Sequence, residues 1–113
     1  MIDFIPTLIS AFKNKGINIV HADAADSNAT VPCYTYRESG NSDSAVGDTV
    51  GYSDLQYTIE VWGRNYSEFI ADCTKVDKIM HELKFYRVGI TEQSYQGLYR
   101  KIMIYDSLKK EKY

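Results

Sequence analysis

The sequence predicts a single α+β domain in which an antiparallel sheet of about four strands carries two helices on one face. Residues 55–61 alternate strictly between apolar and polar side chains, which is typical of a half-buried strand. Residues 67–84 repeat apolar side chains at the spacing of one helical face. At 113 residues, the chain has the length of one domain with one modest core.

A first helix is expected near the N-terminus. Asp3 is a candidate N-cap, and Pro6 is tolerated in a first helical turn. Lys13 and the residues up to Gly16 favour an end there, because cations suit a helix C-terminus and glycine can adopt the left-handed conformation beyond it. The apolar spacing of one helical face is carried by Ile5, Leu8, Ile9 and Phe12.

Two strands and a second helix are expected next. Residues 17–22 form a short extended segment, 31–39 a strand with Pro32 near its start, and 54–64 the clearest strand. Asn65, with a glutamate three residues later, resembles a capping box. The apolar stripe of the helix that follows consists of Phe69, Ile70, Cys73, Val76, Ile79, Met80 and Leu83.

Two further strands, 85–90 and 98–105, complete the order helix-strand-strand-helix-strand-strand. The charged tail 107–113 is expected to fray. The stretch 39–53, SGNSDSAVGDTVGYS, is small, polar and glycine-rich, so we expect a flexible loop.

Composition limits the class of protein. With 44% apolar and 25% charged residues, the chain has ordinary globular values, and no apolar run approaches the roughly 18 residues of a membrane span. The N-terminus does not resemble a signal peptide, so a cytosolic origin and reduced thiols at Cys33 and Cys73 are expected.

Charge is unevenly distributed along the chain. Residues 1–60 hold three basic and eight acidic side chains, a net of −5, whereas residues 61–113 hold ten basic and seven acidic, a net of +3. This polarity fits two solvated faces, and it equally fits association between copies of the chain.

Catalytic signatures are absent from the sequence, so neither an enzyme nor a cofactor is expected. His21, Asp23 and Asp26 have the chemistry of metal ligands, but a strand end followed by a solvated turn explains them as well. We expect His81 to be a half-buried structural residue rather than a general base, because no nucleophile accompanies it.

Ten tyrosines are many for this length. Strands favour aromatic residues, and tyrosine and tryptophan are also enriched at interfaces. Aromatics mixed with cations at 85–87 and 98–105 allow stacking on single-stranded nucleic acid, which the overall acidity disfavours. Lys101 is expected on the helix-free face together with the predicted interface residues Trp62, Tyr34, Tyr36, Tyr99, Met103 and Tyr105.

Several segments together resemble a known family. They are PCYTY, the polar loop after it, LQYTIEVWGRNYSE running into the amphipathic helix, and the closing FYRVGITEQSYQGLYRKIMIYDS. In this order they resemble the small tail completion proteins of long-tailed phages and prophages, which comprise the tail terminator and head-to-tail joining group. The likeness is strongest over residues 54–106.

The resemblance implies a structural virion protein of the neck and tail, assembled in the host cytoplasm. Six copies would form a ring that caps the last ring of tail-tube protein, ends tail growth and joins a head-completion or stopper protein, while DNA passes through unread. A head-side stopper or adaptor, and a stand-alone α+β domain that binds a small ligand, are the alternatives. The resemblance also implies that the 39–53 loop becomes ordered on assembly, with Val46, Val50 and Tyr52 as anchors. The acids of the same region, Asp43, Asp48 and Asp54, would suit a channel surface that must not bind DNA.

Overall fold

The computed structural model describes residues 2–24, 30–46 and 50–112, with side chains throughout except at 43–46, 50, 111 and 112. Five strands form one sheet in the order β1-β2-β3-β5-β4. The elements in chain order are α1 (Ile5–Lys13), β1 (Ile19–His21), a 3-10 turn (Ala22–Ala24), β2 (Cys33–Val46), β3 (Val50–Gly63), α2 (Tyr66–Glu82), β4 (Tyr86–Tyr95) and β5 (Leu98–Lys112).

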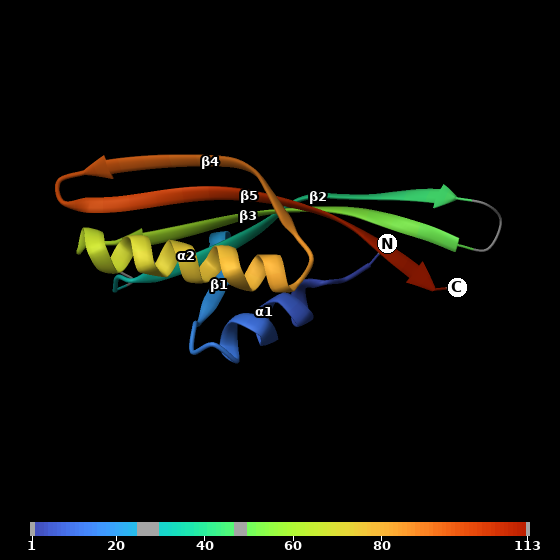
Figure 1. Cartoon of the computed structure of the whole chain (residues 1–113), viewed down its shortest axis with the longest axis horizontal. Coiled ribbons are helices and arrows are strands. Elements are labelled where there is room, and N and C mark those ends of the chain that lie inside the picture. The colour runs from blue at the N-terminus through green and yellow to red at the C-terminus, as the bar shows by residue number, and fades with distance from the viewer. Residues whose placement is uncertain (1, 25–29, 47–49, 113) are drawn as a thin grey trace.

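Both helices lie on the same face of the sheet, which confirms the α+β class (Figure 1). The expected count of about four antiparallel strands is too low, because the short extended segment is a fifth strand. This strand, β1, runs parallel to β2, so the sheet is mixed. All other neighbouring strands are antiparallel.

The ends of the helices follow local chemistry. The Asn65 side chain accepts a hydrogen bond from the Glu68 N–H at 3.1 Å, which confirms the predicted cap of α2. At the other end, Phe85 N–H donates to Met80 O at 2.9 Å, and Lys84, with φ of 67°, adopts the left-handed conformation. This is a Schellman ending formed without glycine. Phe4 occupies the N-cap position of α1 and makes no side-chain cap.

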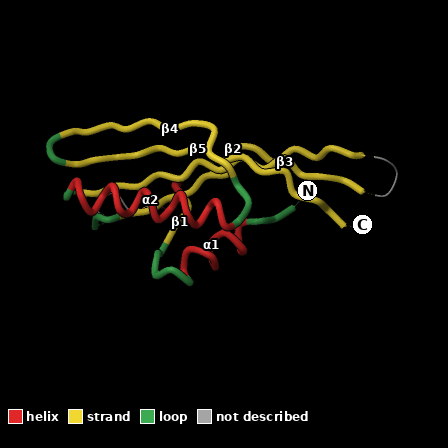
Figure 2. Tube along the Cα trace, viewed as in Figure 1, coloured by secondary structure: helices red, strands yellow, loops and turns green. Residues whose placement is uncertain are grey.

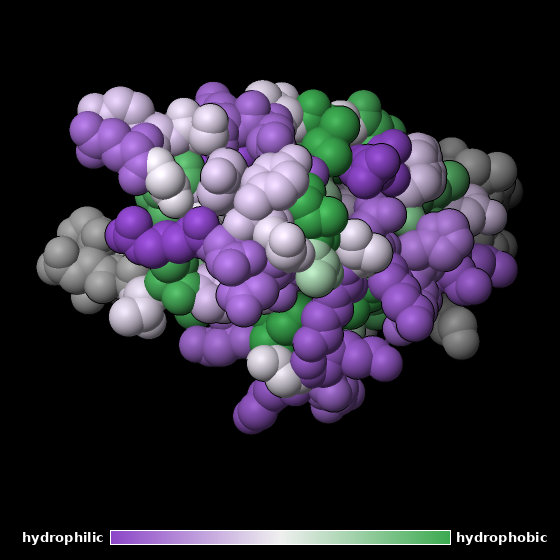
Figure 3. All heavy atoms as spheres, turned by 60° about the vertical axis from the view of Figure 1, so that its left-hand side comes forward, coloured by the Kyte–Doolittle hydropathy of each residue, from purple (hydrophilic) through white to green (hydrophobic). Residues whose placement is uncertain are grey.

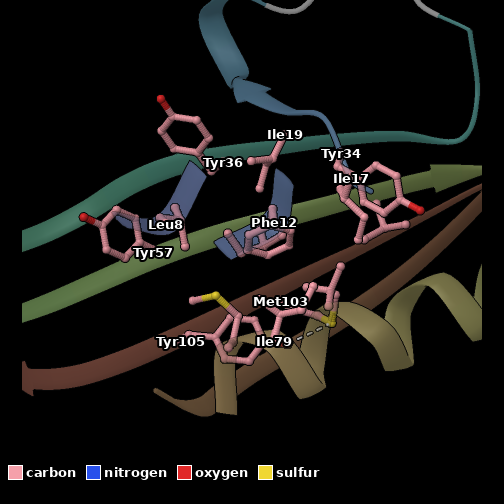
Figure 4. Packing of buried hydrophobic residues seen from close by; sticks show 14 of the residues in the cluster. Leu8, Phe12, Ile17, Ile19, Tyr34, Tyr36, Tyr57, Ile79, Met103 and Tyr105 are labelled. Atoms are coloured by element: carbon pink, nitrogen blue, oxygen red, sulfur yellow. Dashed lines mark hydrogen bonds between the residues drawn. The ribbon is translucent and has the colours of Figure 1, made fainter. Parts of the chain in front are cut away.

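The core lies between the sheet and the helices. On β3 the four alternating apolar side chains Leu55, Tyr57, Ile59 and Val61 are each fully buried, as expected. The predicted α2 stripe is confirmed at its centre, and only Ile70 and Leu83 at its margins are partly exposed. Side chains of α1 complete the cluster, which Figure 4 shows packed between strands and helices.

Within the stretch 39–53, the described residues 39–46 and 50–53 are strand rather than loop. β2 continues to Val46 and β3 begins at Val50, with registered pairs such as Ser42 with Asp54. Residues 47–49 lie outside the described residues. Backbone pairing does not require apolar side chains, and here β3 pairs with β2 on one edge and β5 on the other, so a polar sequence still forms strands.

The C-terminal residues also form strand rather than a frayed tail, since β5 pairs with β3 up to Lys112. Side chains fasten this extension at its base. Ser107 Oγ donates to Lys84 O at 2.8 Å, and Lys109 Nζ donates to Leu83 O at 2.6 Å. The same ammonium lies 4.8 Å from the centroid of the Phe85 ring, and burial lowers the pKa of Lys109.

The distal parts of β2, β3 and β5 therefore form a three-stranded ribbon that projects past the helices, hereafter the arm (Figure 2). It consists of residues 40–46, 50–56 and 107–112. With it the molecule is elongated, at 54 Å by 22 Å by 22 Å.

Ile79→Ala is expected to lower the free energy of unfolding by about 2–5 kcal/mol, because it leaves a cavity in the core. Leu83→Ala, at a partly exposed position of the same helix, is the matched control and should cost clearly less. Denaturant titration of both variants measures the difference. Equal losses would contradict the packing described here.

Candidate interaction surface

Four of the six predicted interface residues lie in the core instead. Tyr34, Tyr36, Met103 and Tyr105 are between 1% and 9% exposed and face the helices. The reason is strand register. Residues that are paired across neighbouring strands point to the same face, and Tyr105 is paired with the core residue Tyr57.

The buried tyrosines keep their hydroxyl groups at the rim of the core. Tyr57 Oη donates to the Glu38 carboxylate at 3.1 Å, and Tyr105 Oη donates to Asp77 at 2.9 Å. Figure 4 shows the hydroxyls of Tyr34 and Tyr57 directed away from the cluster. Burial raises the pKa of both Tyr57 and Tyr105, and the adjacent carboxylates raise it further. These phenols stay neutral and act as hydrogen-bond donors.

The helix-free face is organised around Trp62 and Arg100. The Arg100 guanidinium lies 4.7 Å from the centroid of the Trp62 ring. It donates to Glu60 at 2.7 Å on β3 and to Gln93 at 3.3 Å on β4. Among the described residues, Arg100 Nε has no hydrogen-bond acceptor. One arginine thus links three strands on this face.

Lys101 is not on this face, contrary to expectation. Its register partner on β3 is the core residue Val61, so it points to the helices, where it pairs with Glu92 at 3.2 Å. Tyr99 also lies on the helix side and stacks against Phe69 at 5.7 Å between ring centroids. Of the six predicted residues, only Trp62 lies on the helix-free face.

Exposed apolar side chains gather on β4 rather than on the middle of the sheet. Tyr86, Val88, Ile90 and Tyr95 are 50% to 74% exposed. Figure 3, which looks from the side of the β4–β5 turn, shows hydrophobic groups separated by polar ones. The sequence predicted an uncovered apolar face on the helix-free side of the sheet. Instead, most of the exposed large apolar side chains of the described residues lie on the edge strand β4.

The expected assembly residues lie at the far end of the arm. Asp43 is paired with Ser53, and Val46 with Val50, so their backbones are in strands. Tyr52 is half-buried and lies on β3 opposite Lys110 of β5. Asp48 lies outside the described residues.

The candidate metal residues have other partners. The Asp23 carboxylate pairs with Arg37 at 2.6 Å, and this hydrogen bond holds the pKa of Asp23 below its ordinary value. His21 Nδ1 accepts from the Asp23 N–H at 3.0 Å. Asp26 lies outside the described residues, and within those residues no group of three or more His, Cys, Asp or Glu side chains is placed to hold a metal ion. His81, expected to be half-buried, is exposed on α2.

Both cysteines are free thiols. Cys73 is buried on α2, and burial raises its pKa to about 11. Burial also raises the pKa of Cys33, which is half-buried on β2. A raised pKa keeps a thiol protonated and therefore weakly nucleophilic.

A hollow of about 560 Å³ lies beside β1. Its polar side chains include Lys75, Cys33 and Asn18, and the remaining lining is mostly apolar or backbone. This combination contains neither a nucleophile with an activating base nor paired carboxylates. The hollow is therefore a surface recess whose lining shows no catalytic set of residues.

No model of a known protein family matches the sequence, and no curated protein matches it. Of the helices that the structure describes, neither is both long and apolar enough to cross a membrane. The function is therefore inferred from the surfaces and the sequence of the chain itself.

A double-mutant cycle of Trp62→Leu and Arg100→Met is expected to give a coupling energy of about 0.5–1 kcal/mol in unfolding experiments, because the guanidinium lies over the ring. Arg100→Met combined with Ile79→Ala, on the opposite side of the sheet, is the control and should be additive. A Trp62–Arg100 coupling no larger than that of the control would contradict the stacked geometry.

Cys73 is expected to react with iodoacetamide at least about 10-fold more slowly than Cys33 in the native protein at pH 8, because its thiol is buried and protonated. Mass spectrometry of timed samples separates the two sites. In urea both cysteines should react at similar rates. Equally fast native reaction at both would show that Cys73 on α2 is not buried in the core.

Proposed function

We propose that this chain is a structural phage protein that forms a ring at the head-proximal end of the tail. There it terminates growth of the tail tube and joins the tail to the head. Its partners are further copies of itself in a hexamer, the tail-tube protein, and a head-completion or stopper protein. The resemblance of residues 54–106 to tail completion proteins is the starting point of this proposal.

The arm is the observation that carries the proposal. Its outer part projects past both helices (Figure 1), whereas Ser53, Leu55 and Ser107 nearer its base are buried. Small side chains lie on its helix side, where Gly51 and Ser53 are buried. An extended ribbon of this kind supplies backbone edges and surface to a partner more than it supplies core to its own chain.

The distribution of charge supports association between copies. Strands β1, β2 and most of β3 come from residues 1–60, which carry a net of −5. Strands β5 and β4 come from residues 61–113, with a net of +3. Because the sheet order is β1-β2-β3-β5-β4, strands from the acidic half lie toward one edge of the sheet and strands from the basic half toward the other edge. The acidic part of one copy and the basic part of another attract each other.

The same charges suit a ring through which DNA passes without being bound. The chain has a formal net charge of −2, whereas proteins that hold DNA present clusters of cations to the phosphates. On the arm, Asp43, Asp54 and Glu111 balance three lysines, so it presents no excess of positive charge.

A non-enzymatic role agrees with the hydrogen-bond partners of three carboxylates. Asp77 and Glu38 accept hydrogen bonds from core tyrosines, and Asp23 is paired with Arg37. These carboxylates stabilise the fold. The thiols, with raised pKa values, are poor nucleophiles.

The alternatives differ in what they would bind. A stopper or adaptor of the neck would form a comparable ring with other neighbours. A stand-alone domain would bind a small ligand, for which the hollow beside β1 is the available recess. Light scattering across a range of protein concentrations separates a ring-forming protein from a monomer that binds a ligand.

Shortening the arm is expected to abolish joining of heads to tails while leaving the fold intact. Residues 43–53 are replaced by Asn-Gly, because Ser42 and Asp54 are a registered pair and a two-residue turn can close such a hairpin. The readouts are the yield of infectious particles and electron microscopy of unjoined heads and tails.

Circular dichroism and thermal melting of the shortened protein control for folding. The variant keeps Leu55 and every other residue of the core cluster, so a single cooperative transition should remain. Normal yields of infectious particles from the shortened variant would show that the arm is dispensable and would remove the main support for the proposal.

A further inference from the structure

Four stretches of strand in the described structure have one edge without a neighbouring strand. They are β1, the whole of β4, β2 beyond its three positions paired with β1, and β5 beyond its last residue paired with β4. An unpaired edge presents backbone N–H and C=O groups to any strand that approaches. Proteins usually protect such edges.

Two of these edges carry recognisable protection. β1 is only three residues long, which makes it a poor template. Residues 107–112 of β5 contain three lysines, and lysine on an edge opposes strand addition. By contrast, β4 and residues 37–46 of β2 contain neither lysine nor proline.

The edge of β4 is also unusually apolar for a surface. Four side chains of this strand, Tyr86, Val88, Ile90 and Tyr95, are at least half exposed. Aromatic and β-branched side chains favour strand pairing. Both the composition and the exposure of β4 therefore fit a strand that another strand covers in an assembly.

The two edges that lack lysine and proline match each other. β4 has 10 residues, and the free part of β2, residues 37–46, has the same length. Each has a bulge near its beginning, between Arg87 and Gly89 in β4 and between Glu38 and Gly40 in β2. Regular strand continues after both bulges to the end of each segment.

The charges of the two strands permit pairing of these unlike edges. Residues 37–46 carry Arg37, Glu38 and Asp43, a net of −1, whereas Arg87 and Glu92 of β4 cancel. Pairing two β2 edges would bring two negative segments together. A contact between unlike surfaces repeats from copy to copy and closes into a ring when the rotation permits.

We propose that β4 of one copy adds as a strand to residues 37–46 of β2 in the next copy, so that the sheets continue around the assembly. This inference rests on the proposed ring and identifies the surfaces that build it. Backbone hydrogen bonds hold the contact, and the exposed apolar side chains of β4 are covered by the neighbour.

The test compares three full-length variants by light scattering across protein concentrations. Ile90→Lys and Thr91→Lys place a charge on the β4 edge, and each should weaken self-association at least about 100-fold. Tyr66→Lys is the matched control, because Tyr66 is 48% exposed, close to the 50% of Ile90, and lies on α2 away from the arm and from both strand edges. It should leave association unchanged. Circular dichroism verifies that each variant folds.

Amide hydrogen exchange of the unmodified protein tests both edges without mutation. Assembly should slow exchange at least about 10-fold in β4 and in residues 37–46 together. Protection of β4 without protection of residues 37–46 would indicate a symmetric β4–β4 pair and would overturn the inference.

Two further outcomes separate this inference from the proposed function. If the protein assembles while exchange in β4 is unchanged and both edge variants assemble normally, the strand pairing is wrong and the ring remains. If the protein stays monomeric at every concentration, and also with tail-tube protein present, the ring and the strand pairing both fail.

Discussion

Every other element of this protein takes its position from β3, which pairs with β2 along one edge and with β5 along the other. Its alternation assigns Leu55, Tyr57, Ile59 and Val61 to the helix side. Because paired residues share a face, the same alternation is imposed on both neighbouring strands. A shift of one residue in either register would expose the apolar side chains and bury polar ones.

Two different sources of stability act along this strand. Near the helices, apolar burial dominates, and α2 closes the core over β3 and β5. In the arm, the strands are held by backbone pairing and by a few anchors at its base, such as Lys109 with Leu83 O. The arm is thus connected to the core by continuous strands, while its exposed residues are available for contacts with another molecule.

The tyrosines of the core contribute both an apolar ring and a polar hydroxyl group. Their rings fill the space under the helices, and hydroxyls such as those of Tyr57 and Tyr105 reach carboxylates at the rim. Most of the side chains that were expected at an interface are therefore buried in the core of their own chain. What remains for a partner is backbone at the sheet edges, which is why the proposed assembly depends on strand addition more than on an aromatic patch.

Local pattern was sufficient for the α+β class, for the burial of alternate residues in 55–61, for the α2 stripe and for the Asn65 cap, because periodicity and capping involve neighbours in sequence. The face on which Met103 lies depended on register with β3, which involves residues far apart in the chain. The polar segments 39–46 and 107–112 became strands for the same reason, since their hydrogen bonds come from distant backbone and leave no apolar signal in the sequence.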